Sequence, residues 1–342
     1  MAGQNLPTLK QHVTDRGGSI SHELKYHQAF IAHLAPAAAA NLKNQFGTNV
    51  LIEEDREVIA FGKPGSGDPA QPPQTEPWGI SAIHAVESRA VNRGAGVTVC
   101  VVDTGVQPDH PDLAANIAGG ENFVFKKGTI NPSAWADDNG HGTHVSGTIA
   151  ALDNTIGVVG VAPEAKIFAT KVLNSRGSGY LSDVAEGIRS CLAHGASVAN
   201  MSLGWSGYSQ LVHDAVIEAK NAGMVLVAAA GNESTDVSNS YPAAYPEVIA
   251  VSAVDSNGAF AYFSNFGTKI AFAAPGVSVL STVKGSSYAT YSGTSMASPH
   301  VAGVAALMIS SGSLGFIADD IGLPATQQGA GRINALNTAL NR

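Results

Sequence analysis

The chain has 342 residues, of which 44% are hydrophobic and only 13% are charged, and its formal net charge is −8 at pH 7. A chain of this length and apolar content can bury a large core, which excludes intrinsic disorder for most of it. The negative charge argues against nucleic acid as the main partner, because phosphate binding requires a basic surface. No apolar run approaches the roughly 20 residues of a membrane-spanning helix, so we expect no membrane insertion.

Residues 62–77 divide the chain into two parts. This stretch, GKPGSGDPAQPPQTEP, is rich in proline and glycine and has no apolar periodicity, which is typical of an extended linker. We therefore predict a small domain over residues 1–61 and a large α/β domain over residues 78–342. The small domain carries histidines without metal-binding spacing, which we interpret as surface or half-buried side chains: His12, His22, His27 and His33.

The large domain alternates apolar runs with helical patterns. Residues 181–194 and 209–222 carry apolar side chains at helical spacing, and each stretch ends near a glycine. Strands buried on both faces of a parallel sheet are nearly continuously apolar. Four runs have this character, at residues 97–102, 166–172, 197–201 and 224–230. The succession of strand and helix predicts a doubly wound, mostly parallel sheet with helices on both faces.

Polar residues lie where such a sheet binds ligands, at the ends of strands or the starts of the next helices. Asp103 follows the first apolar run, in VVDTG, where an aspartate is ordinarily a turn or cap residue. His141 lies in DDNGHGTH, and its imidazole is suited to act as a general base. His144 lies three residues further on, but no third ligand has the spacing that a zinc site would need.

Ser295 lies in GTSMASPH, close to the start of a helix, because Pro299 is tolerated only in the first helical turn. By itself such a serine is a helix N-cap. Its functional interpretation is a nucleophile at the positive end of a helix dipole. Asn232 follows the run VLVAAAG and by itself is a turn residue. The conjunction of Asp, His and Ser in small-residue surroundings indicates nucleophilic catalysis.

The segments DTG, HGTH, AAAGN and GTSMASPH together resemble the signature segments of the subtilisin-like serine proteases, over about residues 78–334. The resemblance implies a triad of Asp103, His141 and Ser295, with the side-chain amide of Asn232 in the oxyanion hole. The implied activity is that of a serine endopeptidase of broad specificity, acting on proteins or peptides. An inactive protease-like scaffold and an esterase are the alternatives, although no G-x-S-x-G pattern surrounds Ser295.

The resemblance also implies a cleft in which an extended peptide pairs with two edges of the protein. The residues implied for these edges are Gly177, Ser178, Gly179, Ser202, Leu203 and Gly204. The residues implied around the pocket for the residue before the cleaved bond are Ala228, Ala229, Gly231, Glu233 and Ser240. Small pocket walls predict a roomy apolar pocket, in which Glu233 would modestly favour a basic residue.

Residues 1–61 resemble the inhibitory propeptide of the same family, most clearly in GGSISHELKYHQAFIAHL and VLIEEDREV. The resemblance implies a small α+β domain whose tail occupies the active site, and self-cleavage in the linker between Ala60 and Glu76. A helix is expected around residues 6–14, but the family's first strand before it has no counterpart here. An unrelated N-terminal extension is the alternative.

The loop LDNTIGV, after the helix that begins near His141, resembles the family's calcium loop. An oxygen-rich site with a single carboxylate suits Ca²⁺, which accepts 6–8 oxygen ligands in flexible geometry. The implied ligands are the backbone carbonyls of Leu152, Ile156 and Val158 and the side-chain oxygens of Gln74, Asp112 and Asn154. An ordinary surface loop is the alternative.

Cys100 and Cys191 occupy positions where small core residues are expected, and we favour two buried free thiols over a disulfide. Between Ile309 and Gly331 the helical periodicity is weak, so we expect an abbreviated helix in that region. Most relatives are secreted, and we expect a secreted monomer, although MAGQNLPTLKQH has no apolar run typical of a signal peptide. An intracellular enzyme is the alternative.

Overall fold

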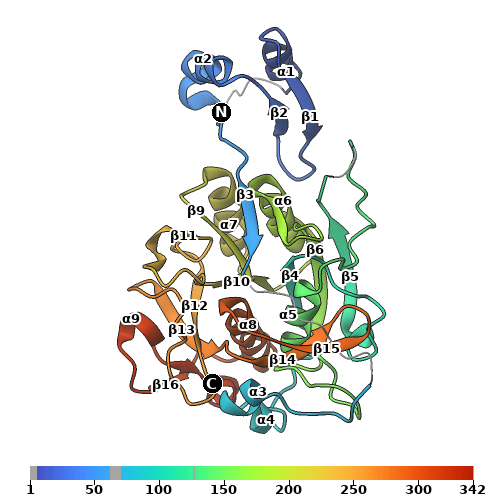
Figure 1. Ribbon diagram of the computed structural model, residues 1–342, viewed down its shortest axis with the longest axis vertical. Helices are drawn as coiled ribbons and strands as arrows, with labels where there is room; N and C mark the ends of the chain where they lie inside the picture. Colours follow the sequence, from blue (N-terminus) through green and yellow to red (C-terminus); the bar gives the residue numbers. More distant parts are fainter. Residues whose placement is uncertain (1–5, 62–70, 126–127, 342) are drawn as a thin grey trace.

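The structure is a computed structural model that describes residues 6–61, 71–125 and 128–341. A small leading lobe, residues 6–52, lies at one end of a large body, residues 71–341 (Figure 1). The tail, residues 53–61, runs from the lobe into the body. The family's first strand, which has no counterpart in the sequence, would fall on residues 1–5, outside the described residues.

The leading lobe is an α+β unit with a small core. Its elements are α1 (Leu6–Thr14), β1 (Ser19–Glu23), β2 (Phe30–His33), α2 (Pro36–Phe46) and the 3₁₀ turn Gly47–Asn49. The antiparallel pair β1–β2 packs with α1 and α2 around Val13, Leu42 and Phe46. The helix expected around residues 6–14 is confirmed. His27 is half-buried, within the predicted range, but its side chain is only 7% exposed and contacts Glu186 of the body.

A nine-stranded sheet forms the centre of the body, in the order β16-β17-β13-β12-β10-β8-β4-β6-β5. All neighbouring strands run parallel except β16 and β17. The strands are β4 (Thr98–Asp103), β5 (Ile117–Asn122), β6 (Lys166–Lys171), β8 (Val198–Met201), β10 (Val225–Ala229), β12 (Ile249–Val254), β13 (Ile270–Pro275), β16 (Ala318–Asp319) and β17 (Arg332–Ile333). The four apolar runs coincide with β4, β6, β8 and β10, which confirms the predicted sheet.

Helices cover both faces of this sheet (Figure 1). Helices α5 (His141–Ala150) and α8 (Thr294–Ser311) pack on one face, and α6 (Leu181–Ala193) and α7 (Gln210–Asn221) on the other. Strand β4 shows the alternation directly, since Val99 and Val101 belong to the first apolar cluster. Cys100 and Val102 belong to the second cluster. Both faces are buried, which explains the continuous apolarity of the strand.

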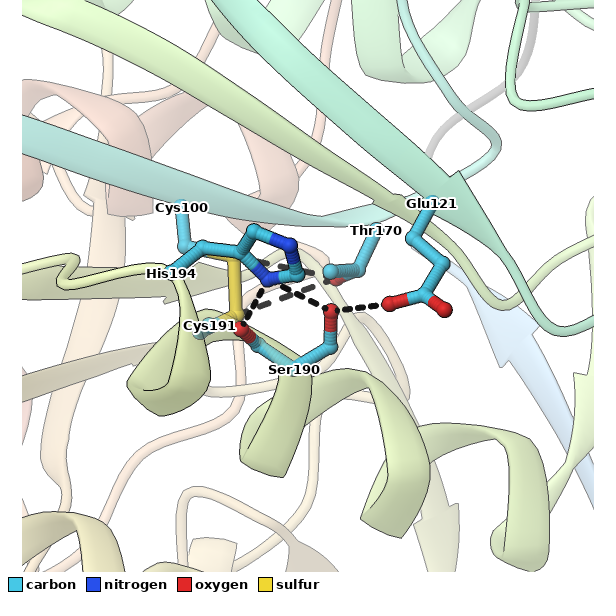
Figure 2. The surroundings of a disulfide bond; sticks show 6 residues. All are labelled: Cys100, Glu121, Thr170, Ser190, Cys191 and His194. Atoms are coloured by element: carbon cyan, nitrogen blue, oxygen red, sulfur yellow. Dashed lines mark hydrogen bonds between the residues drawn. A yellow bond between two sulfur atoms is a disulfide. The ribbon is translucent and has the colours of Figure 1, made fainter. Parts of the chain in front are cut away.

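Cys100 and Cys191 form a disulfide, contrary to the prediction of two free thiols. The pleat of β4 points Cys100 at the face that α6 covers, and Cys191 lies on the inner side of α6, with Cα atoms 5.6 Å apart. Ser190, beside the bridge, donates its hydroxyl to the Glu121 carboxylate of β5 at 2.8 Å (Figure 2). The bridge therefore joins β4, an interior strand of the sheet, to a covering helix, a pairing that only the topology creates.

A second sheet of four antiparallel strands contains the tail. Its order is β11-β9-β3-β7, from β11 (Ser240–Tyr241), β9 (Leu203–Ser206), β3 (Glu57–Ala60) and β7 (Ser178–Tyr180). Figure 1 shows β3 descending from the lobe into the body. A segment of the leading part thus completes a sheet whose other three strands belong to the body.

Only part of the predicted linker is described. Residues 62–70 lie outside the described residues, whereas residues 71–77 lie along the body. Bridges join Pro73 to Ile156 and Thr75 to Val158. Residues 72–75 are therefore backbone paired with the body rather than a free linker.

The remaining elements lie at several places around the body. They are α3 (Trp78–Ala82), α4 (Ala85–Ser88), the 3₁₀ turns Ala114–Asn116 and Val237–Asn239, the hairpin β14 (Val279–Val283) and β15 (Ser287–Tyr291), α9 (Ala325–Gln328) and α10 (Ala335–Leu340). The four-residue helix α9 agrees with the expected abbreviated helix. No helix in the described ranges has the length and apolarity to cross a membrane.

Candidate active site

The imidazole of His141 lies against the carboxylate of Asp103. Its Nδ1 is 2.8 Å from Oδ1 and 2.9 Å from Oδ2, and both side chains are fully buried. Asp103 ends β4 and His141 begins α5, so the pair forms at the carboxyl edge of the sheet. Burial is the largest influence and lowers the pKa of His141, but the charge and hydrogen bond of Asp103 and the charge of Asp137 together outweigh it, so the net pKa is raised. The carboxylate fixes the proton on Nδ1, which leaves Nε2 as a base.

A second carboxylate, Asp137, holds the turn that presents His141. Its Oδ1 accepts the backbone N–H groups of Asn139 and Gly140, at 2.9 and 2.8 Å. Its Oδ2 accepts the backbone N–H and the hydroxyl of Thr143, at 3.0 and 2.6 Å. Its charge also contributes to the raised pKa of His141. Sequence reasoning missed this residue, although the acid in DDNGHGTH precedes the histidine by one helical turn.

Ser295 lies in the first turn of α8, close to the helix start as predicted, and is fully buried, although Pro299 lies inside the helix beyond its first turn. Its Oγ donates to the carbonyl oxygen of Ser202 at 2.9 Å, and the Ser202 hydroxyl donates to the Ser295 carbonyl at 2.9 Å. The Nε2 of His141 is buried, and within the described ranges it has no hydrogen-bond partner. A base without a donor and a serine at the same sheet edge are the two components of a nucleophilic pair.

The side-chain amide of Asn232 is oriented by Thr294. Its Oδ1 accepts both the backbone N–H and the hydroxyl of Thr294, each at 2.9 Å. The Nδ2 donates instead to the carbonyl oxygen of Phe61, the last residue of the tail, at 3.2 Å. A Cβ at Gly293 would lie 2.5 Å from the same carbonyl oxygen, so a glycine is required for the tail to approach.

The tail lies between the two predicted cleft edges. Strand β3 pairs with β7 and β9, the Ala60 N–H donates to the Gly177 carbonyl at 2.9 Å, and the Phe61 N–H donates to the Ser202 carbonyl at 3.3 Å. The structure thus brings all six predicted edge residues against the tail: Gly177, Ser178, Gly179, Ser202, Leu203 and Gly204. This is the geometry of strand addition, in which backbone hydrogen bonds hold an extended peptide.

The ring of Phe61 packs on the edge residue Gly204, where an added Cβ would lie 2.3 Å from the ring. Sequence reasoning missed the residue that organises this region, the buried Asn265. Its Nδ2 donates to the Ala230 carbonyl at 3.0 Å, to Glu233 Oε2 at 2.7 Å and to the Ser240 hydroxyl at 3.0 Å.

The predicted pocket residues lie around this amide, with Ala228 and Ala229 buried in β10 and Gly231 directly after it. A Cβ at Gly231 would lie 2.3 Å from Asn265 Nδ2 and 2.6 Å from Glu233 Oε2, so the backbone approaches both side chains closely. The apolar character of the pocket stays a prediction. The preference for a basic residue through Glu233 stays a prediction.

The residues predicted as calcium ligands also lie together. The carboxylate of Asp112 is fully buried. Its Oδ1 accepts a hydrogen bond from Asn154 Nδ2, and its Oδ2 accepts one from the Val158 N–H, each at 2.8 Å. Gln74 Oε1 accepts the Asn154 N–H at 2.5 Å, and the Leu152 N–H donates to the Asp112 carbonyl at 2.9 Å. Burial raises the pKa of Asp112 to about 6. The carboxylate is thus surrounded by neutral donors and oxygen-bearing groups.

A parallel α/β body whose cleft holds a peptide strand beside a buried Asp–His pair and a helix-start serine defines a serine peptidase. The chain belongs to the subtilase family, whose profile matches residues 94–314. It is therefore a serine endopeptidase of the subtilisin type, and its substrates are proteins.

Individual relatives support the same assignment. The chain is 41% identical to Subtilisin NAT of Bacillus subtilis subsp. natto over 314 residues, which cover 91% of this chain and 78% of the relative. It is 52% identical over 238 residues to a thermostable alkaline protease of Halalkalibacterium halodurans, covering 69% of this chain and 63% of that protein. It is 48% identical over 260 residues to M-protease of Shouchella clausii, and the match covers 75% of this chain and 63% of that protein.

Proposed function

We propose that this protease uses Ser295 as its nucleophile, His141 as its general base and Asp103 to orient the imidazole. The observation that carries the proposal is the Phe61 carbonyl, which Asn232 Nδ2 holds at 3.2 Å beside the start of α8. A carbonyl so placed is in position for attack by a serine at a helix N-terminus, where backbone N–H groups face the developing negative charge.

The reaction starts when the Ser295 hydroxyl turns from the Ser202 carbonyl towards Nε2 of His141. The Oγ forms a bond to the carbonyl carbon while its proton passes to Nε2. The carbonyl electron pair moves onto oxygen, where the Asn232 amide and the Ser295 N–H stabilise the charge. His141 then gives the proton to the leaving amine as the C–N bond breaks, and water hydrolyses the acyl-enzyme by the same steps in reverse.

Ser295→Ala tests the proposal. We expect kcat for peptide hydrolysis to fall by more than about a thousandfold, because triad members act as a unit. The matched control is Ser310→Ala, the same change near the other end of α8, where the hydroxyl donates to the Ala95 carbonyl. Both variants should melt at the wild-type temperature. A Ser295→Ala protein that keeps more than about one-thousandth of the activity contradicts the assignment.

We further infer that residues 6–61 are the enzyme's own propeptide and inhibitor. The tail occupies the cleft in a substrate-like strand, and two of its carboxylates lie at helix starts of the body. Glu53 accepts the N–H groups of Gln210 and Leu211, at 3.0 and 3.3 Å. Asp55 accepts the N–H and the hydroxyl of Ser182, at 3.0 and 2.8 Å. Negative charge at these positive helix ends favours docking.

The lobe itself docks through a turn, residues 24–29, on α6. The Glu186 carboxylate accepts the backbone N–H groups of Lys25 and Tyr26 and faces Nδ1 of His27 at 2.5 Å. Glu121 accepts from Lys25 Nζ at 2.5 Å and from the Tyr26 hydroxyl at 2.9 Å. These contacts hold the lobe on the body independently of the tail, which supports an inhibitor that stays bound after cleavage.

Self-cleavage is then expected at the bond between Phe61 and Gly62, inside the interval that the linker predicts. The wild-type chain should yield two fragments that end and begin at this bond, and Ser295→Ala should stay intact. Mass spectrometry after incubation decides this, with Ser310→Ala as the cleaving control. Identical intact masses for wild type and Ser295→Ala would contradict self-processing. Hydrolysis of an added peptide would still test the triad in that case.

We also propose a structural Ca²⁺ held by the oxygens of Gln74, Asp112 and Asn154 with the carbonyls of Leu152, Ile156 and Val158. The fit rests on Asp112, a buried carboxylate that contacts only neutral donors and whose pKa burial raises to about 6. A hard cation with oxygen ligands would balance that charge and tie residues 71–75 to the body.

Chelation tests the calcium site through stability rather than activity. In the Ser295→Ala background, which prevents self-digestion, EDTA should lower the melting temperature. A hundredfold excess of calcium over its Kd should contribute about 2.7 kcal/mol. Asp112→Asn should abolish the effect of EDTA on the melting temperature. Asp109→Asn, a change at an exposed acid nearby, should keep that effect. A melting curve that EDTA leaves unchanged in the parent contradicts the site.

We infer that the enzyme is secreted, because the Cys100–Cys191 disulfide forms and persists in oxidising compartments. All groups of the proposed site come from one chain, so we expect a monomer. Fractionation of the source cells and gel filtration of the Ser295→Ala protein measure these two properties. Retention in a reducing cytoplasm, or elution as a dimer, would contradict them.

A further inference from the structure

The side chain of Arg56 is held by three carbonyl oxygens of the body. Its Nη1 donates to the Ser206 carbonyl at 2.7 Å, and its Nη2 donates to the carbonyls of Gly207 and Tyr208, at 3.3 and 2.8 Å. We call these three oxygens the carbonyl cup. Counted back from the proposed cleaved bond, with Phe61 as the first residue, Arg56 is the sixth.

The cup lies in a fixed turn between β9 and α7. Gly207 adopts a φ of 84°, and its N–H donates to the Asn239 side-chain oxygen at 3.2 Å. Tyr208 packs edge-on against Tyr241 and Tyr245, and its hydroxyl donates to the Gln210 side chain at 2.8 Å. The three oxygens are therefore positioned by the body itself and do not depend on the tail for their arrangement.

The chemistry of the cup selects a cationic donor. Carbonyl oxygens only accept hydrogen bonds, and three of them facing one point favour positive charge. A planar guanidinium presents five N–H donors in a rigid fork, whereas an ammonium is a compact, more strongly hydrated charge. Within the described ranges no carboxylate forms an ion pair with Arg56, so the carbonyls provide the recognition. An aspartate or glutamate in this position would be repelled.

The backbone at the same position is fixed as well. The Arg56 carbonyl accepts the Leu181 N–H at 3.1 Å, on the opposite side of the cleft from the cup. A chain that follows β3 is thus in contact with both walls at the sixth residue. A side chain at this sixth position can therefore reach the three carbonyl oxygens of the cup.

We propose that the carbonyl cup is a substrate subsite that binds arginine at the sixth residue before the cleaved bond. This inference rests on the proposed function, because it requires substrates to follow the path of the tail. Once the tail leaves, the cup stays on the body and meets the next peptide. Protein segments with arginine in this position should therefore be cleaved faster than those with a neutral side chain there.

The decisive experiment changes the peptide and leaves the enzyme unchanged. Quenched fluorescent peptides begin with Arg-Glu-Val-Ile-Ala-Phe, or with alanine or lysine in place of the arginine, and extend past the phenylalanine. With processed enzyme we expect kcat/KM about tenfold higher for arginine than for alanine, with lysine between them. A shorter peptide, beginning at Ile-Ala-Phe, should be cleaved in every case and reports the proposed catalytic function separately.

A variant then locates the preference in the cup. A Cβ at Gly207 would lie 2.7 Å from Arg56 Nη1, so Gly207→Ala should remove the preference for arginine while hydrolysis of the short peptide persists. The matched control is Gly223→Ala, whose φ is 90° and whose added Cβ meets nothing within 4 Å. Equal kcat/KM for the arginine and alanine peptides in the wild type, or a full preference in Gly207→Ala, overturns the proposal.

Discussion

The leading lobe and the body are stabilised by different kinds of contact. The body packs two large apolar clusters against the two faces of its sheet, and a buried disulfide joins sheet to helix. The lobe has a small core around Val13, Leu42 and Phe46. It meets the body through two body carboxylates, Glu121 and Glu186, and through aromatic packing of Tyr26 near Phe123.

This difference would allow the proposed propeptide to leave while the body stays folded. Apolar burial contributes roughly 25 cal/mol per Å² and is retained in the body whether or not the lobe is bound. Hydrogen bonds to charged groups contribute about 1.5–3 kcal/mol each, but water can replace them when the partners separate. A polar interface over a compact apolar body is therefore suited to a segment that guides and inhibits the enzyme and is then released.

The largest expected effect comes from breaking the covalent link within the body. Cys100→Ala together with Cys191→Ala should lower the free energy of unfolding by about 4 kcal/mol, because the bridge closes a loop of 91 residues. Urea denaturation of the Ser295→Ala protein with and without the bridge measures it. Docking of the lobe should persist, because its hydrogen bonds to Glu121 and Glu186 involve neither sulfur. An unchanged unfolding midpoint would show that packing alone stabilises the body.

A smaller effect should come from the interface. Glu186→Gln keeps the shape of the side chain but removes the charge that the turn at residues 25–27 surrounds. We expect the cleaved lobe to dissociate about tenfold more readily, because charge-assisted hydrogen bonds become neutral ones. The lag before full activity in self-processing chains reports this release. Glu218→Gln is the control, since Glu218 pairs with Arg189 away from the lobe. Equal lags in both variants would contradict a charge-based interface.

The smallest effect concerns the acid limb of the activity profile. Asp137 helps to raise the pKa of His141, so Asp137→Asn should lower that pKa. A base with a lower pKa stays unprotonated to lower pH, and the acid limb of kcat/KM should therefore shift towards acid. The lost hydrogen bonds should also reduce the maximum about tenfold. Asp138→Asn, a neighbouring acid paired with Lys171, should leave the limb in place. If the acid limb of kcat/KM does not shift in Asp137→Asn, the charge of Asp137 has no effect on His141 and the residue only holds the turn.

The elements predicted best from sequence are those whose pattern is local. The four apolar runs became β4, β6, β8 and β10, and the helical patterns became α6 and α7. Proline rules placed the start of α8 within one residue of Ser295. The candidate site followed because parallel strands bring their carboxyl ends to one edge, so Asp103 and His141 meet there.

Other features were invisible because they depend on which distant segments face each other. Nothing local to Asp137 or Asn265 distinguishes them from ordinary turn residues, and their importance comes from donors on other segments. His27 resembled any surface histidine until α6 supplied Glu186. Residues 72–75 have a linker's composition, yet they pair with residues 156–158.

The sequence by itself determined the α/β fold, because periodicity is local, and its composition and short motifs predicted the division near residue 62 and the residues of the candidate site. The tertiary structure alone decided that Cys100 and Cys191 are bonded, that Phe61 reaches Asn232, and that Arg56 meets three carbonyls. Each of these contacts joins residues far apart in the chain. Their approach is set by strand order and by the face each side chain takes, which no single segment encodes.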